Sequence, residues 1–581
     1  MVLQTKQTSS DRHRQLVDYL QTMYKSFHNH KQSITELLYK CRRQRQGVYE
    51  ADILQAIRKF GGSEEFVKLT ARKCQIAESW LVDAFINNVE NSWNIKSSLE
   101  NATGDEAAKK MTSYITEQLH NGGFKKALNE FILDICTYPA AILKGPVINS
   151  KNQLKYIKNN SANSWQIAEQ IKAIETFQRV SPFDFFPAPN CKDISYADVI
   201  ERFYLSATEI SHLSSTEYYN KEAIEKVINE YYNNQLADCT KLTDEAVAAQ
   251  TVNQVNGLQN EEMYYNSHLI GALEFRCQVP AKLLPEEFIE ENNLAEHKVY
   301  DMWIILIGNH IVKLQLNADV LSRRPYFVAS FCENNDSIWG EGIPQKIVGP
   351  QRAINATKRA LINNLAIASG PQVTVNLRSL PPESKITKMH PWKIWQYKGD
   401  GVSGNPFEFF QPDCNTELLL KAIDRFSKEA DEDSGIPPYL AGDGNSNDNV
   451  MNTVGGLSMM VNISSKSIRR VISNIDQKVI IPLITTLYNL NMLDEECPND
   501  FKGDLTITAT GIYGALVNER NNEEQIKQIV QLLENDDVKA LIDDSGIRQI
   551  VKKLCDLAGI PSNVLKIKKD NEYEDVKSKS K

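Results

Sequence analysis

A run of Asp and Asn residues late in the chain has the composition of a cation-binding loop. In Asp443-Gly-Asn-Ser-Asn-Asp-Asn449 the first three ligand positions of a calcium loop hold oxygen donors, namely Asp443, Asn445 and Asn447. The sixth position needs a glycine and is Asp448, and the twelfth needs a bidentate glutamate and is Val454. The pattern therefore favours a flexible polar loop, and we expect no metal and no cofactor there.

Other patterns that carry chemistry were sought along the whole chain. The consecutive acids Asp431, Glu432 and Asp433 suggest Mg²⁺ chemistry in a nuclease, but no paired carboxylates on strands with a nearby lysine accompany them. A solvated charge run is the better interpretation. The sequence has no P-loop, no G-x-S-x-G and no H-E-x-x-H, and its nine histidines are dispersed. These absences favour a structural protein over an enzyme.

Composition bounds the class of protein. The 581 residues include ten cysteines, and no two of them have C-x-x-C spacing, which favours a reducing compartment over a disulfide or zinc framework. The first residues lack the apolar core of a signal peptide, and no run of about eighteen apolar residues occurs. We therefore expect synthesis in a cytoplasm and no membrane contact.

The net charge limits how the protein could bind nucleic acid. The formal charge is -9, whereas a protein that grips DNA statically usually has a basic excess, because each phosphate contact needs a Lys or Arg. Tight static binding is therefore disfavoured. Transient passage of DNA is not, since a channel that lets DNA slide should not hold it.

The elements that would position these residues begin with helices. Residues 1–45 read as a helical or partly disordered arm, 50–86 as helices broken at Gly61 and Gly62 with a new start at Ser63, and 105–135 as helix. Strand patterns follow: 140–145 and 156–158 as a hairpin-like pair, then 174–181, 199–204, 273–280, 298–307, 310–316 and 325–331, with a helical stretch at 208–234. The chain is therefore predicted to be α+β and helix-rich.

The second half is organised differently. Residues 350–369 and 415–432 predict two helices that flank a strand-and-turn insert at 373–410. A polar loop of about twenty residues follows, and then a long helix from Leu457 to about Leu487 in which Pro482 should produce a kink. Residues 503–509 alternate as a strand, 521–558 predict short helices, and 567–581 form a charged tail.

Eight strings in this order resemble the portal, or head-to-tail connector, proteins of tailed phages, especially short-tailed ones. They are Arg179-Val-Ser-Pro-Phe-Asp-Phe-Phe-Pro-Ala-Pro-Asn-Cys191 with Ala197-Asp-Val-Ile-Glu-Arg-Phe203, Trp339-Gly-Glu-Gly-Ile-Pro344 with Gln351-Arg-Ala-Ile-Asn-Ala-Thr-Lys-Arg-Ala360, Asp433-Ser-Gly-Ile-Pro-Pro-Tyr-Leu440 with Thr453-Val-Gly-Gly-Leu-Ser-Met-Met460, Ile468-Arg-Arg-Val-Ile-Ser-Asn-Ile-Asp476, and Gly503-Asp-Leu-Thr-Ile-Thr-Ala-Thr-Gly-Ile-Tyr-Gly514. The resemblance covers roughly residues 45–535, and each string alone is short.

The resemblance implies a division of the chain into the parts of a portal subunit. These are an N-terminal arm (1–45), a wing of helices and strands (46–340), a first stem helix (341–369), a small α/β clip (370–413), a second stem helix (414–434), a tunnel loop (435–456), a long kinked helix that returns to the wing (457–515), a crown of C-terminal helices (516–566) and a charged tail (567–581).

The same resemblance implies a function. The chain would form a ring, typically of twelve copies, at one vertex of a capsid in the virion. Double-stranded DNA would pass through the ring during packaging and ejection. Expected partners are the terminase large subunit, tail adaptor proteins, and the major capsid and scaffold proteins. The family's portal is not itself an ATPase, which agrees with the missing P-loop.

The resemblance to portal proteins also implies which residues would form the functional sites. The tunnel loop would face the channel with polar and acidic side chains that repel DNA weakly: Asp443, Asn445, Asn447, Asp448, Asn449 and Asn452. Four cations near the loop would contact phosphates or acids of a neighbouring copy: Lys466, Arg469, Arg470 and Lys478. The clip would touch terminase or adaptor through Trp392, Lys393 and Trp395.

Two alternative functions stay open at this point. The chain could be another virion protein, such as a tail adaptor or a minor capsid component, although adaptors are usually shorter and lack the helix–insert–helix order. It could also be a metal nuclease that uses Asp443, Asp448 and the acids at 431–433. A Mg²⁺-dependent cleavage assay with Asp443→Ala as control separates the second alternative from a structural ring.

Overall fold

The computed structural model describes residues 2–85, 94–97, 102–159, 164–214, 216, 218–240, 269–317, 319, 322–370, 372–375, 407–436, 466–495, 497–503 and 505–508. Within these residues the fold mixes helices and sheets, with more residues in helices, as the sequence predicts. The described helices include none with a stretch both long and apolar enough to cross a bilayer.

A five-stranded antiparallel sheet with the order β4-β5-β6-β7-β8 lies in the first half of the chain. Its strands are β4 (Phe185–Pro187), β5 (Val199–Ser206), β6 (Leu269–Pro280), β7 (Val299–Ile307) and β8 (His310–Leu316). The last four confirm predicted strands, whereas β4 was not predicted. Along β6, Leu273, Phe275 and Cys277 pack on one face, while Ile270 and Ala272 pack on the other. Both faces are therefore apolar and both need a cover.

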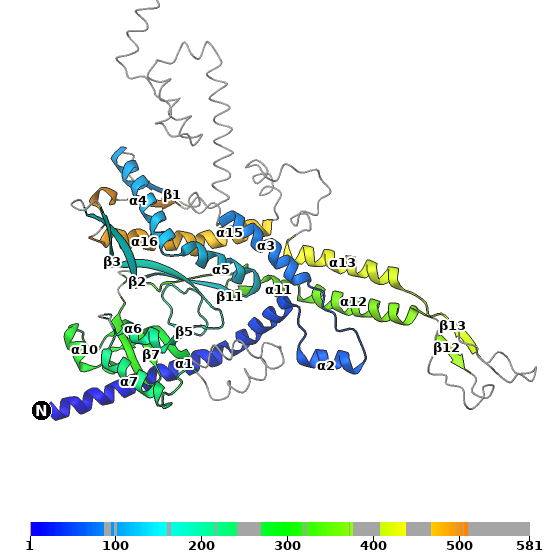
Figure 1. The fold of residues 1–581 in the computed structure, drawn as a ribbon, viewed down its shortest axis with the longest axis horizontal. Helices are drawn as coiled ribbons and strands as arrows, with labels where there is room; N and C mark the ends of the chain where they lie inside the picture. Colours follow the sequence, from blue (N-terminus) through cyan, green and yellow to red (C-terminus); the bar gives the residue numbers. More distant parts are fainter. Residues whose placement is uncertain are drawn as a thin grey trace, which may run out of the picture.

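Helices supply that cover. The long helix α1 (Val2–Gln46) lies along one face, where Leu16, Leu20 and Tyr24 are at most 1% exposed, so the predicted arm is helical and packs on the sheet through these residues (Figure 1). The short helices α6 (Ala207–Leu213) and α7 (Lys221–Tyr232) cover the other face through Ile210 and Ile224. The 3-10 turn η2 (Ala281–Leu283) and helix α10 (Glu286–Glu291) connect β6 to β7.

A second sheet, β3-β2-β9, is built on a long hairpin. Strand β2 (Ala141–Asn159) pairs with β3 (Ser164–Val180) on one side and with β9 (Tyr326–Ala329) on the other. The predicted pairing of 140–145 with 156–158 is wrong, because both segments belong to β2. Gly145 and Pro146 lie at a register shift between Lys144 and Val147, where the strand continues through a bulge.

Helices α4 (Ala102–Asn121) and α5 (Phe124–Thr137) pack on this hairpin, and α3 (Leu69–Phe85) packs on α5. The three helices form one large core with the late helices. The helix expected to start at Ser63 begins at Leu69 instead, after the short helix α2 (Ala51–Lys59). Side chains of a distant helix explain the delay. Asn355 Oδ1 accepts from the Val67 N–H at 3.0 Å, and Gln351 Nε2 donates to the Val67 carbonyl at 2.7 Å, so the segment before α3 stays extended.

Helices α12 (Val348–Ala368) and α13 (Thr416–Ser434) lie side by side and extend away from the rest of the described chain (Figure 1). At their far end β12 (Gln372–Val375) pairs antiparallel with β13 (Phe407–Phe410), which confirms two helices flanking an insert that begins and ends in strands. The rest of that insert is outside the described residues. The pair joins the body through β10 (Cys332–Asn334), β11 (Ser337–Glu341) and α11 (Ile343–Lys346).

The last long helix is continuous but not uniform. It runs as α15 (Lys466–Ile475), a π-helical turn at Asp476–Ile480, and α16 (Ile481–Leu493). Pro482 has no N–H to donate to the preceding turn, and the wider turn directly before it accommodates that loss. The prediction of a distortion at Pro482 is thus met by a π-helical turn. After η6 (Asn499–Phe501), β14 (Leu505–Thr508) pairs with β1 (Asn94–Ser97).

Candidate functional site

The α12–α13 pair exposes an unusual amount of apolar surface. Two helices that stand out from a body can bury only the faces they turn to each other, so their other large apolar side chains face solvent. Exposed fractions of about half or more are found on α12, on α13 and on the adjoining strand β13: Leu365 45%, Ile367 51%, Phe409 62%, Phe410 50%, Leu418 68% and Leu420 47%. A surface of this kind is typical of a contact with another polypeptide.

The two helices also differ in charge. Helix α12 carries Arg352, Lys358 and Arg359 and no acidic residue, whereas the last turns of α13 are rich in carboxylates. Near the body, Asp431 forms an ion pair with the buried Lys73, whose ammonium also donates to the Ile436 carbonyl. The acidic end of α13, which opposes the helix dipole, is therefore partly compensated by a cation from α3.

The predicted cations lie on the late helix. Arg470 is exposed on α15, Arg469 is half-buried beside it, and Lys466 is the first residue of the helix. Lys478, in the π-helical turn, forms an ion pair of 2.7 Å with Glu333 of β10 in the same chain. Lys478 therefore pairs with an acid of its own chain, whereas we expected it to contact DNA phosphates or acids of a neighbouring copy.

The other predicted site residues are not among those described. The tunnel-loop residues 443–452 lie between α13 and α15, and Trp392, Lys393 and Trp395 lie between β12 and β13, all outside the described residues. Within the part of the chain that the structure does describe, no three His, Cys, Asp or Glu side chains gather closely enough to hold a metal ion. The hypothesis of a metal nuclease therefore gains no support from these residues.

A buried carboxyl group lies in the π-helical turn. Asp476 is 7% exposed, and within the described chain its Oδ1 atom has no hydrogen-bond partner. Burial raises the pKa of this carboxyl group to about 7. The neighbouring amide nitrogen of Asn474 is likewise buried and unpaired among described residues. Sequence patterns did not single out Asp476, because it sits at the end of an otherwise ordinary apolar stripe.

Between the two sheets lies a buried ionic cluster that sequence analysis also missed. Lys144 Nζ on β2 lies 2.7 Å from Glu201 on β5 and 2.6 Å from Glu274 on β6, and Glu274 also pairs with Arg276 at 2.9 Å. Burial alone would raise the pKa of Glu274, but the two cations outweigh it and hold the pKa well below its usual range. Charged residues at inward positions of apolar strands were the signal that could have revealed the cluster.

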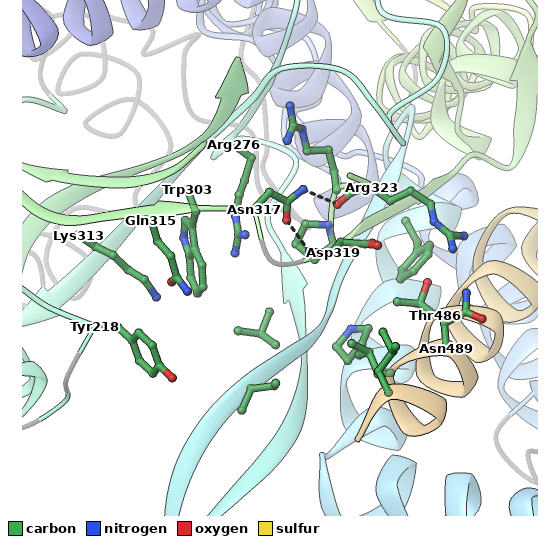
Figure 2. A pocket seen from close by; sticks show the side chains of 18 of the residues that line it. Tyr218, Arg276, Trp303, Lys313, Gln315, Asn317, Asp319, Arg323, Thr486 and Asn489 are labelled. Atoms are coloured by element: carbon green, nitrogen blue, oxygen red, sulfur yellow. Dashed lines mark hydrogen bonds between the residues drawn. The ribbon is translucent and has the colours of Figure 1, made fainter. Parts of the chain in front are cut away.

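Beside this cluster is a pocket of about 600 Å³ (Figure 2). One wall is formed by β6, β7 and β8 with Arg276, Trp303 and Lys313, and the opposite wall comes from α16 with Thr486 and Asn489 (Figure 2). The start of β2 closes a third side. The pocket thus joins segments that are far apart in the sequence.

Comparison of the sequence with protein-family models and with curated proteins finds no match. The fold defines a helix-rich α+β chain with a projecting helix pair. Its function is therefore argued from that geometry.

Proposed function

We propose that this chain is a subunit of a portal-type ring, a DNA channel at one vertex of a viral capsid that serves packaging, head–tail joining and ejection. The observation that carries the proposal is the apolar surface of the projecting α12–α13 pair. In a single chain Leu418 is 68% exposed and Leu365 is 45% exposed, because the helices that carry them contact the body only at one end. Neighbouring copies packed around an axis would cover both.

The charges of the two helices support a head-to-tail arrangement of copies. A ring is closed by heterologous contacts, in which one surface of a subunit meets a different surface of the next. The basic helix α12 of one copy and the acidic-rich helix α13 of its neighbour are complementary in this sense. The contact would combine apolar burial with opposite charges at the rim.

The overall charge agrees with DNA that slides. A net charge of -9 on each copy gives a ring that repels phosphates weakly overall, so passing DNA would not be held. The terminase large subunit, tail adaptors, and capsid and scaffold proteins remain the proposed partners, and the virion the proposed location.

The experiment that tests the proposal is native mass spectrometry of the full chain, together with negative-stain images. We expect one closed oligomer, near twelve copies, with a central hole. The double variant Leu418→Glu with Leu420→Glu should shift the protein to monomers, because it places carboxylates in the apolar contact. Tyr232→Glu is the matched control, since Tyr232 is 70% exposed on α7, away from the pair.

A chain that stays monomeric under every salt condition contradicts the proposal. So does a ring that Leu418→Glu with Leu420→Glu leaves intact, because the contact would then lie elsewhere on the molecule.

A further inference from the structure

The pocket of Figure 2 combines apolar side chains with several cations. Pro146, Val147 and Ile148 of β2 face Leu490 and Leu493 of α16 across an opening rimmed by two exposed side chains, Ile148 at 63% and Leu493 at 64%. The sheet wall holds the Arg276 guanidinium and the Lys313 ammonium, and Arg323 lines another part of the pocket. A volume near 600 Å³ lies within the range of about 300–1,000 Å³ that is usual for small-molecule sites.

Lys313 is the central cation of this pocket. Its side chain comes from β8, is 4% exposed, and has no hydrogen bond or ion pair with any residue in the described part of the chain. Its Nζ lies 3.0 Å from the centroid of the Trp303 ring, and the Arg276 guanidinium lies 3.7 Å from the same centroid. Groups this close to one centroid must occupy opposite faces, so Trp303 is held between two cations.

The two cations differ in how they are neutralised. Arg276 forms an ion pair with Glu274. Lys313 instead contacts the rings of Trp303 and Tyr219, and these are its main attractive contacts. Burial lowers the pKa of Lys313 to about 7. Repulsion from Arg276 and from Lys144 also lowers it, whereas attraction to Glu274 raises it. An ammonium in this position lacks an anion.

A second cation of the pocket is also incompletely satisfied. Arg323 lines the pocket, and its buried Nε has no hydrogen-bond partner among the described residues. Its neighbour Arg324 differs, because that guanidinium pairs with Asp301 and with Asp198. The only carboxylate that lines the pocket within the described residues is Asp319.

We propose that this pocket binds a small anionic amphiphile, a monocarboxylate whose charged group pairs with the Lys313 ammonium and whose hydrocarbon body lies between β2 and α16. Arg323 adds attraction from the other side. A phosphate monoester fits less well, because it would need several donors at one point and the remaining cations near Lys313 are already paired with acids. The site is independent of the proposed ring, since none of its lining residues lies on α12 or α13.

Calorimetric titration of the full chain at pH 6.5 with octanoate, and with octan-1-ol as the uncharged analogue, tests this site. We expect octanoate to saturate one site per chain and octan-1-ol to bind at least about tenfold more weakly, the effect of one charged hydrogen bond. Lys313→Met should weaken octanoate binding by about tenfold or more, and Arg323→Gln by a smaller factor. Lys192→Met is the control, because Lys192 is 65% exposed and pairs with Asp336 outside the pocket.

Ile148→Glu gives a variant whose folding is secure, because Ile148 is an exposed residue at the mouth. It should weaken octanoate binding by a larger factor than octan-1-ol binding, because both ligands lose apolar contact but only octanoate is repelled by the new carboxylate. The site is refuted if the full chain shows no saturable octanoate binding, if octan-1-ol binds equally well, or if Lys313→Met binds octanoate as the unchanged chain does. A pocket filled by a neighbouring copy would give the first of these results. Ring formation and octanoate binding can succeed or fail separately, so the two proposals are tested apart.

Discussion

Single residues carry much of the chemistry in this chain, and Lys313 is the clearest example. Its pKa is about 7 in the folded chain and about 10.5 in the unfolded chain. Between these values the unfolded state binds more protons, so the free energy of unfolding rises with pH across that window. The penalty for the buried ammonium is complete below pH 7.

Lys313→Met removes this penalty and should therefore stabilise the protein where it is largest. We expect a gain of roughly 1–3 kcal/mol in the free energy of unfolding at pH 6 and almost none near pH 10. Urea unfolding of the two chains at both pH values measures it. An equal effect at both would show that Lys313 titrates normally. A stabilised protein that loses octanoate affinity would mark Lys313 as a residue kept for binding.

Ionisation of Asp476 changes the free energy of unfolding with pH in the opposite direction to ionisation of Lys313. Burial raises the pKa of its carboxyl group from 3.8 to about 7, so the folded state binds more protons between pH 4 and pH 7 and the free energy of unfolding falls as pH rises through that window. Asp476→Asn should then stabilise the chain by roughly 1–3 kcal/mol at pH 8 and change little at pH 4. Thermal unfolding at the two pH values decides it, with the exposed Asp336→Asn as control. Destabilisation at pH 8 would contradict the assignment.

At the scale of elements, the start of α3 depends on α12. The Gln351 side chain accepts from the Thr70 N–H at 3.0 Å and donates to the Val67 carbonyl at 2.7 Å, and it is 2% exposed. It therefore satisfies a helix N-terminus that has no cap of its own sequence.

Gln351→Leu keeps the size of the side chain and leaves the buried N–H of Thr70 unpaired, while the Val67 carbonyl keeps its bond from the Leu69 N–H at 2.8 Å. We expect a loss of roughly 1–3 kcal/mol in the free energy of unfolding. The control is Gln75→Leu, at an exposed position of α3. Hydrogen exchange should show faster exchange at the start of α3 in the variant, and unchanged protection there would mean that Gln351 does not act as the cap.

The elements also show what the sequence could predict. Strands β6, β7 and β8 are predictable because apolar and polar residues alternate along them, and α12 and α13 because apolar positions recur at helical spacing. The start of α3 was missed because its cap comes from Gln351, almost three hundred positions away. The pocket could not be predicted for the same reason, because Lys313 and Leu490 are far apart in the sequence and line one pocket only when the fold brings β8 and α16 together.

At the scale of the whole molecule, the proposed ring predicts a dependence on salt. If the basic face of α12 meets the acidic α13 of the next copy, ionic strength should weaken the contact while apolar burial persists. We expect partial dissociation of the ring on raising NaCl from about 0.1 M to about 1 M, where the screening length falls from about 10 Å to about 3 Å. Mass photometry of the full chain measures it.

Charge reversal on one helix gives the matched variants. Arg352→Glu, at an exposed position of α12, should lower the salt at which the ring dissociates, whereas Lys126→Glu, at an exposed position of α5, should not. A ring whose stability rises with salt in the unchanged chain would indicate a contact held by apolar burial alone.

The packing of α1 has a consequence for synthesis. This helix is made well before its partners: Tyr24 donates to the carbonyl of Thr240, 216 positions on, and Arg12 reaches Glu296, 284 positions on. At about 5–20 residues per second, the ribosome needs on the order of 15–60 s to supply them. During that time Leu16 and Leu20 cannot pack on the five-stranded sheet, and their apolar side chains stay exposed. We therefore expect the nascent chain to bind a chaperone. Fragments that end before β7 should be insoluble.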